Sequence, residues 1–301
     1  MTIVKRILLT FLFVLIACSA FAGEYKIAVI KSDSPLPYDE VIAGFRSELH
    51  GQNIRLISID EVSRSRLAVK ISEIRPDALL CLGTRALENT SDIRNIPKIF
   101  CLVTLSKAYS FAHRQDVYGV VIDISPAVQF KIIKNVFPKV KRIGVIYNPV
   151  HNQKLLGEAE RSSHAMGFRL IKKHVHSIKE IPSALNELEN KVDLLLAIYD
   201  QTVYGPETAK YILLFTLRKN IPFVGFSPQF AKAGALLALY GNYEDMGRQA
   251  ASIAKQVLNN EKPAYKYVEP RHTGIAVNEK AANALNISFP DNFLRKADKI
   301  Y

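Results

Sequence analysis

The chain has 301 residues, with 40 Lys and Arg against 28 Asp and Glu, which gives a formal net charge of +12. A chain of this length can bury a sizeable core and can form two domains of ordinary size. Its positive charges are scattered singly along the sequence instead of forming a long run. We therefore expect a solvated basic surface and no nucleic-acid partner.

The N-terminus resembles a secretory signal. Lys5 and Arg6 precede an apolar run over residues 7–17, and small residues then lead to an A-x-A sequence at residues 20–22. This pattern is typical of a signal peptide, and the run is too short to span a bilayer. We expect a signal peptide over residues 1–22 and a periplasmic or otherwise extracytoplasmic protein. A lipobox-like sequence at residues 15–18 leaves open an alternative in which Cys18 is acylated.

Short apolar runs alternate with amphipathic helical patterns along the rest of the chain. Several of these runs are apolar throughout, as expected for parallel strands whose two faces are both covered by helices. The repeated strand–helix units predict an α/β fold. The predicted strands cover residues 25–30, 54–59, 78–82, 98–103, 119–122, 142–147, 169–174, 194–198, 223–226 and 235–239.

The pattern divides near Asp123, because five predicted strands precede this residue and five follow it. A further strand candidate at residues 274–277 suggests that the chain returns to its first half. We predict two Rossmann-like lobes with parallel sheets, joined by a hinge of several crossovers. Lobe 1 is expected over residues 23–123 plus about 260–301, and lobe 2 over residues 124–259. Ligands of such sheets bind beyond the carboxyl ends of the strands.

Two cysteines lie at equivalent points of two predicted strands. Cys81 and Cys101 each stand three residues before a threonine. If these strands are neighbours, an oxidising compartment would allow a disulfide between them. The alternative is a pair of small buried side chains.

Ordered segments across nearly the whole chain resemble one known family. They include PDALLCLGT at residues 76–84, KRIGVIYNP at 141–149, DQTV at 200–203 and GRQ at 247–249. In this order they are similar to the ABC-transporter substrate-binding protein family, which has the type I periplasmic-binding fold. Some members bind tryptophan or other aromatic amino acids. The resemblance implies two α/β lobes, one bound small molecule, no cofactor and no catalysis.

Four positions depart from the usual pattern of this family. Leu105 and Ser106 stand where the resemblance leads us to expect an acidic residue and a proline. Ser227 and Asn242 stand where the family often has aspartate. Fewer carboxylates weaken the attraction for a ligand ammonium group, so amino-acid specificity does not follow from the resemblance.

Polar residues that follow predicted strands are the candidate ligand contacts. Asp200 is the leading one, because the resemblance implies that it accepts a hydrogen bond from a ligand amine or hydroxyl; its alternative is helix capping. Tyr147 offers a flat face for a ligand ring, or packs beneath its own loop. Thr84 and Thr104 are each expected to cap a helix through the side-chain hydroxyl, and contact of the helix's N-terminal amides with an anion is the additional role considered for both. The full set is Ser32, Asp33, Ser34, Thr84, Thr104, Tyr147, Asn148, Asp200, Gln201, Thr202, Ser227 and Asn242.

Motifs of the common enzyme classes are missing from the sequence. It contains no G-x-S-x-G elbow, no phosphate-binding P-loop and no G-x-G-x-x-G fingerprint. His174 and His176 would share one face of a strand, but the lysines around them and the lack of a second Cys/His cluster favour surface histidines. We expect no enzyme, no cofactor and no metal site.

The expected partners are a small-molecule ligand and an ABC permease in the membrane, with the protein itself a monomer. A ligand-sensing subunit of the same fold is the alternative. Such a subunit would signal to a membrane histidine kinase or a chemoreceptor instead of a permease.

Overall fold

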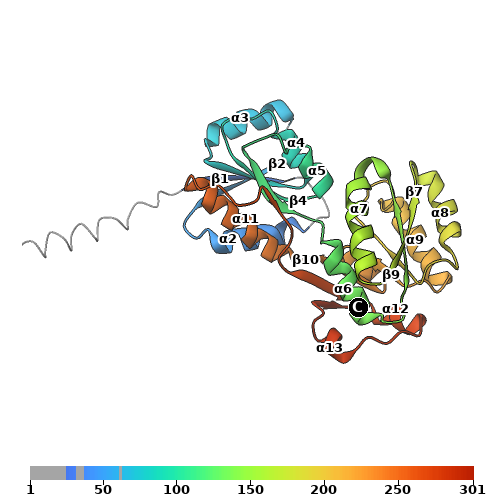
Figure 1. Ribbon diagram of the computed structural model, residues 1–301. Helices are drawn as coiled ribbons and strands as arrows, with labels where there is room; N and C mark the ends of the chain where they lie inside the picture. The colour runs from blue at the N-terminus through green and yellow to red at the C-terminus, as the bar shows by residue number, and fades with distance from the viewer. Residues whose placement is uncertain (1–24, 32–36, 61–62) are drawn as a thin grey trace, which may run out of the picture.

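Two α/β lobes lie side by side in the computed structural model, which describes residues 25–31, 37–60 and 63–301 (Figure 1). The expected signal peptide and Cys18 lie outside the described residues. No helix within the described ranges combines the length and the apolar composition needed to cross a bilayer. The predicted fold class, two lobes with mostly parallel sheets, is confirmed.

The first lobe is built mainly from the N-terminal part of the chain. Its elements are β1 (Lys26–Lys31), α2 (Tyr38–Glu48), β2 (Asn53–Ser58), α3 (Arg64–Ile74), β3 (Ala78–Leu82), α4 (Thr84–Asn89), β4 (Lys98–Val103), α5 (Leu105–Tyr109), β5 (Val117–Val121), α11 (Tyr243–Leu258) and β11 (Tyr267–Val268). As far as the described residues go, the sheet has six parallel strands in the order β11-β5-β4-β3-β1-β2. Every residue of β3 and β4 is buried, because helices cover both faces of the sheet.

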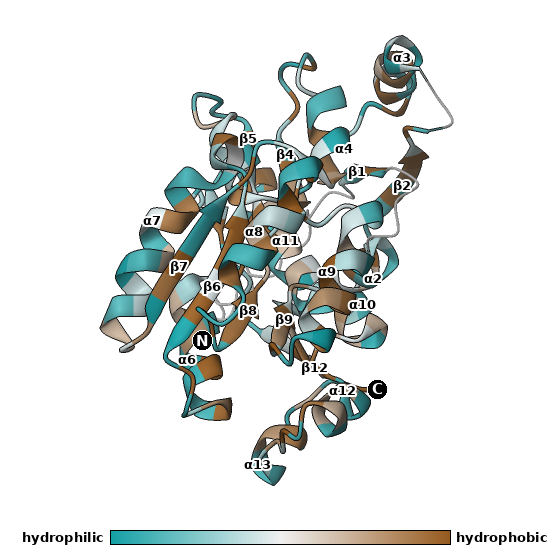
Figure 2. Ribbon diagram, turned by 90° about the vertical axis from the view of Figure 1, so that its right-hand side faces the viewer, coloured by the Kyte–Doolittle hydropathy of each residue, from teal (hydrophilic) through white to brown (hydrophobic). Residues whose placement is uncertain are grey.

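The second lobe contains the middle and the end of the chain. Its elements are α6 (Pro126–Val136), β6 (Arg142–Tyr147), α7 (Pro149–Ala165), β7 (Arg169–His174), η1 (Ile178–Glu180), α8 (Ile181–Leu188), β8 (Leu194–Leu196), α9 (Pro206–Arg218), β9 (Phe223–Gly225), α10 (Pro228–Ala233), β10 (Leu237–Gly241), β12 (Thr273–Val277), α12 (Glu279–Ala284), α13 (Asp291–Leu294) and β13 (Lys299–Ile300). The strand order among the described residues is β13-β12-β10-β9-β8-β6-β7. Figure 2 shows hydrophobic strands at the centre of this lobe and helices with hydrophilic outer faces.

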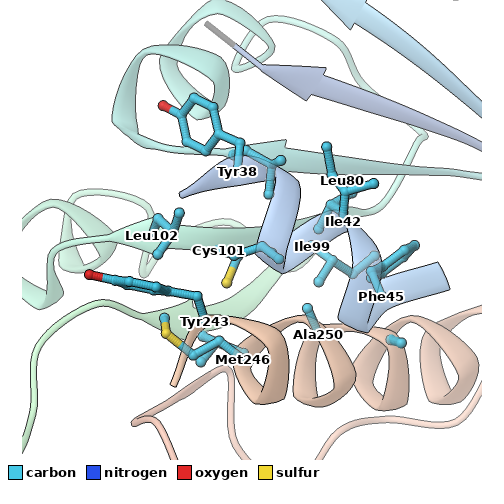
Figure 3. Packing of buried hydrophobic residues seen from close by; sticks show 14 of the residues in the cluster. Tyr38, Ile42, Phe45, Leu80, Ile99, Cys101, Leu102, Tyr243, Met246 and Ala250 are labelled. Carbon is cyan, nitrogen blue, oxygen red and sulfur yellow. The ribbon is translucent and has the colours of Figure 1, made fainter. Parts of the chain in front are cut away.

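The expected lobe boundary is wrong at the C-terminal end. Helix α11, which we expected in the second lobe, packs against α2 of the first lobe (Figure 3). Strand β12, which we expected in the first lobe, pairs antiparallel with β10 of the second. Residues 243–268 therefore belong to the first lobe and residues 273–301 to the second. Periodicity predicted the type of these elements, but it does not specify the sheet that each one joins.

The possible disulfide is also wrong. In the register of β3 and β4, Cys81 stands opposite Phe100, and Cys101 stands opposite Leu82. A shift of one residue turns the two thiols to opposite faces of the sheet. Both cysteines are free and buried, and they belong to different hydrophobic clusters. They are core residues, and burial raises the pKa of the Cys81 thiol to about 11.

Candidate functional site

A pocket lies beside the crossovers that join the lobes, on the side of the second lobe. Its lining includes three residues that follow strands: Asp123 after β5, Tyr199 after β8 and Phe226 after β9. Helix α7 contributes Leu155, and helix α6 contributes Gln129. Asp123 is the one acidic side chain among the described lining residues, and most of the others are apolar. Mostly apolar walls with a few placed polar groups are typical of small-molecule sites. The cavity volume in this arrangement is about 20 Å³, which is room for about one water, so an organic solute requires the cavity to widen.

Asp123 is a buried acid at the first crossover, with 8% of its surface exposed. Its carboxylate accepts a hydrogen bond of 2.6 Å from the backbone N–H of Leu105, the first residue of α5. Burial, reinforced by the charge of Glu269, raises the pKa of Asp123 to about 6, although the Leu105 N–H acts in the opposite direction. A cationic group bound beside Asp123 would therefore stabilise its charged form.

Further carboxylates from other elements act on the same region. Glu269 follows β11 at the start of the last crossover, and Glu158 lies on α7. Burial, and then the charge of Glu158, raises the pKa of Glu269 above its ordinary value. Acids from both lobes thus repel one another here, in a chain whose net charge is +12. These carboxylates concentrate negative charge beside the pocket.

The aromatic part of the pocket wall is held in place by its own contacts. The rings of Tyr199 and Phe226 lie 4.1 Å apart between centroids, at an angle of 37°. The Tyr199 hydroxyl donates a hydrogen bond of 3.0 Å to the backbone oxygen of Phe226. Burial raises the pKa of Tyr199 well above its ordinary value, so this residue stays neutral. The pair presents an apolar, aromatic surface close to the Asp123 carboxylate.

The leading sequence candidate, Asp200, directs its carboxylate into the protein. One oxygen accepts hydrogen bonds from the Asn148 backbone at 2.6 Å and from the Asn152 side chain at 2.8 Å. The other accepts from the backbone N–H groups of Thr202 and Val203, at 2.9 and 3.2 Å. The side chain is 5% exposed. Asp200 therefore joins the loops that follow β6 and β8, and its acceptor capacity is already used.

The other predicted contacts have varied surroundings. Asn148 caps α7, and its amide donates to the Thr202 hydroxyl at 3.1 Å. Asn242 caps α11 by accepting from the Asp245 N–H at 3.0 Å. The remaining described candidates lie at strand or helix ends: Thr84 begins α4, Thr104 precedes α5, Tyr147 ends β6, Gln201 is exposed after Asp200, and Ser227 precedes α10. Ser32, Asp33 and Ser34 lie outside the described residues.

Residues that line the pocket were missed in the sequence. Asp123 follows an apolar strand, as Asp200 does, so the same signal pointed to both. Tyr199 stands directly before Asp200 in the chain. The hydrophobic pattern of the sequence does not indicate the direction in which the Tyr199 ring points, so its place in the pocket wall could not be predicted. The region that the structure describes has no group of three or more His, Cys, Asp or Glu side chains arranged to hold a metal ion. His174 and His176 lie 5.7 Å apart between ring centroids.

This fold and pocket define a class of protein. Two α/β lobes joined by crossovers, with a pocket beside them, are the architecture of periplasmic binding proteins. The sequence model described as "ABC transporter substrate binding protein" matches residues 42–301, and the chain belongs to that family. A search of curated proteins finds no match.

Solved structures with the same fold include three bacterial proteins. An ABC domain in complex with L-Trp from Streptococcus pneumonia is 20% identical and aligns over 93% of this chain and all of its own, with a TM-score of 0.67. A conserved domain protein from Vibrio cholerae is 22% identical over 93% and 100%, with a TM-score of 0.67. A ligand-free, open substrate binding protein with adhesive properties from Clostridium difficile is 21% identical over 91% and 98%, with a TM-score of 0.75.

Proposed function

We propose that this protein is exported and captures a small organic solute that combines an ammonium group with an apolar, preferably aromatic, body. An aromatic amino acid fits this description. The bound solute would then be handed to an ABC permease for import. The observation that carries the proposal is the buried Asp123 carboxylate in the same pocket as the Tyr199–Phe226 ring pair.

The chemistry of the pocket supports this choice of solute. A buried carboxylate is stabilised by a hydrogen-bonded cation, and the charges of Glu269 and Glu158 add to the attraction. Aromatic walls favour a ring, which they contact face-on or edge-on. The L-Trp bound to the Streptococcus protein has both parts. Threonine and serine groups at strand ends of the first lobe, such as Thr84 and Thr104, are proposed to receive the ligand carboxylate.

Direct fluorescence tests the proposal, because the chain contains no tryptophan. Protein freed of carried-over ligand by unfolding and refolding is titrated with L-tryptophan. Excitation at a wavelength that indole absorbs and the 13 tyrosines do not ensures that the emission belongs to the ligand alone. We expect a blue shift as the indole enters an apolar pocket, and weaker binding for indole-3-propionate, which lacks the ammonium group. Equal binding of the two compounds would exclude a role for the carboxylates. Failure of every aromatic amine and amino acid to bind would reject this class of ligand.

Asp123→Asn gives the matched variant, since the amide has the same shape and its oxygen can still accept from Leu105. We expect affinity for L-tryptophan at pH 7.5 to fall more than about tenfold, which is a typical loss for a buried charged hydrogen bond. Wild-type affinity should also fall as the pH drops through about 6, where Asp123 becomes protonated, and the variant should lose the part of this dependence that Asp123 causes. Asp39→Asn, at a side chain that is 95% exposed, is the control. Wild-type affinity in Asp123→Asn would remove Asp123 from the site.

A further inference from the structure

Helices α5 and α7 form one of the contacts between the two lobes outside the crossovers (Figure 1). The ammonium nitrogen of Lys154 on α7 lies 3.6 Å from the centroid of the Tyr109 ring on α5. This is the geometry of a cation–π interaction. Lys154 forms no ion pair with a carboxylate anywhere in the described part of the chain, so the ring is its charge-stabilising neighbour.

Tyr109 is positioned by the first lobe. Its ring meets Tyr267 of β11 edge-on, with 6.3 Å between centroids, and Tyr267 lies 5.4 Å from Phe100 of β4. The first residue of α5, Leu105, donates its N–H to Asp123, the acid of the pocket. Tyr109 therefore sits on a short helix that is fixed at one end by the pocket acid and at the other by an aromatic contact.

Lys154 belongs to a helix of the second lobe, α7, that also contributes to the pocket wall. Its neighbour Leu155 lines the pocket, and Glu158, one helical turn further along α7, contributes to the field around Glu269. The face of α7 that carries Lys154 and Glu158 is thus directed to the first lobe. Movement of α7 away from α5 would separate Lys154 from Tyr109 and would shift Leu155, which lines the pocket, relative to the first lobe.

We propose that Tyr109 and Lys154 form an interlobe latch that stabilises the arrangement in which α5 and α7 are in contact, which is called closed below. The proposal rests on the proposed function, in which closure retains the ligand. Both residues act as positioning residues, since neither lines the pocket. A cation–π pair at an exposed site changes an equilibrium by about two- to fivefold. We therefore expect the ratio of closed to open molecules to fall by this factor when the latch is removed.

Distance measurements on the full-length, ligand-free protein test the latch. Spin labels attached through a keto amino acid at positions 69 and 211, which are 55% and 44% exposed, report the separation of the lobes without using the native cysteines. Lys154→Met and Tyr109→Leu should each shift the distribution toward longer distances, and Tyr109→Phe, which keeps the ring, should not. Lys210→Met, at an exposed lysine of α9, is the matched control.

The outcomes are distinct. Unchanged distances in Lys154→Met overturn the latch, and because Lys154 is exposed this variant is expected to fold even where Tyr109→Leu does not. A double variant that opens no further than either single variant supports it, since one interaction can be lost only once. A latch variant that opens but still binds L-tryptophan, with faster dissociation, supports both proposals. Failure of the wild type to bind aromatic amines rejects the proposed function, while the ligand-free distances still decide the latch.

Discussion

Asp123 and Asp200 both follow a buried strand, but their carboxylates have different surroundings. The Asp200 carboxylate accepts hydrogen bonds from four donors of its own lobe. The Asp123 carboxylate accepts one from another residue, the N–H of Leu105. A carboxylate whose acceptor sites are all occupied by protein donors holds the loops that carry those donors. A carboxylate beside a pocket that has unoccupied acceptor sites can accept a hydrogen bond from a ligand. The local sequence is similar in the two cases. The hydrogen-bond partners, which come from residues distant in the chain, make the difference.

Asp200→Ala is therefore expected to reduce stability. The substitution leaves four donors, on Asn148, Asn152, Thr202 and Val203, without their acceptor in a buried site. We expect the free energy of unfolding in urea to fall by about 2–4 kcal/mol. Asp39→Ala, at an exposed carboxylate, should stay within about 0.5 kcal/mol of the wild type. If Asp200→Ala loses ligand binding but keeps the stability of the wild type, Asp200 contacts the ligand and does not have the structural role described above.

At the scale of elements, the sequence predicted most strands and helices but not all of their neighbours. The apolar run at residues 98–103 matches β4, and the run at 142–147 matches β6. Such runs carry a strong signal because both faces of each strand are buried. Strand β12 is different, because nothing in TGIAV indicates whether it pairs with β5 or β10, or in which direction. Long-range pairing depends on complementary packing that a single sequence does not display.

The packing of α11 on α2 depends on two glycines. A methyl group at Gly247 would lie 2.1 Å from the Val41 backbone oxygen, and one at Gly44 would lie 1.8 Å from the Glu244 backbone oxygen. Backbone atoms cannot move aside as a side chain can, so the helices would have to separate. The buried face that they share also includes Phe45, Met246 and Ala250 (Figure 3).

Gly247→Ala is expected to lower the free energy of unfolding by about 2–3 kcal/mol, although alanine is the better helix former. Gly157→Ala in α7 is the matched control, because a methyl group there meets only the end of Arg161, at 3.9 Å. This variant should be neutral or gain about 0.5–1 kcal/mol. Chemical denaturation measures both. Similar effects of the two substitutions would show that helix propensity, and not the close approach of α2 and α11, decides the result.

At the scale of the whole molecule, α11 of the first lobe holds the last crossover, residues 269–272. The Gln249 amide donates to the Glu269 backbone oxygen at 3.1 Å and accepts from the Arg271 N–H at 3.0 Å. Asp245 accepts from the Arg271 side chain at 2.8 Å and lies 2.9 Å from Nδ1 of His272. Burial acts to raise the pKa of Asp245, but the bonds to His272 and Arg271 outweigh it and hold this pKa below its usual range. The stability that this carboxylate contributes is thus present above about pH 4 and is lost as the pH falls further.

Gln249→Ala is expected to loosen this crossover while leaving both sheets intact. The Arg271 N–H loses its acceptor, so its hydrogen exchange should accelerate by about tenfold, which corresponds to the loss of one hydrogen bond. Because the same segment carries Glu269 toward the pocket, affinity for L-tryptophan should fall as well, by a smaller factor than in Asp123→Asn. Lys255→Ala, on the exposed side of the same helix, is the control. Exchange measured by mass spectrometry on peptides covering residues 267–273 separates the outcomes. Unchanged exchange in Gln249→Ala would mean that β11 and β12 alone fix the crossover, and that α11 does not couple the first lobe to the pocket.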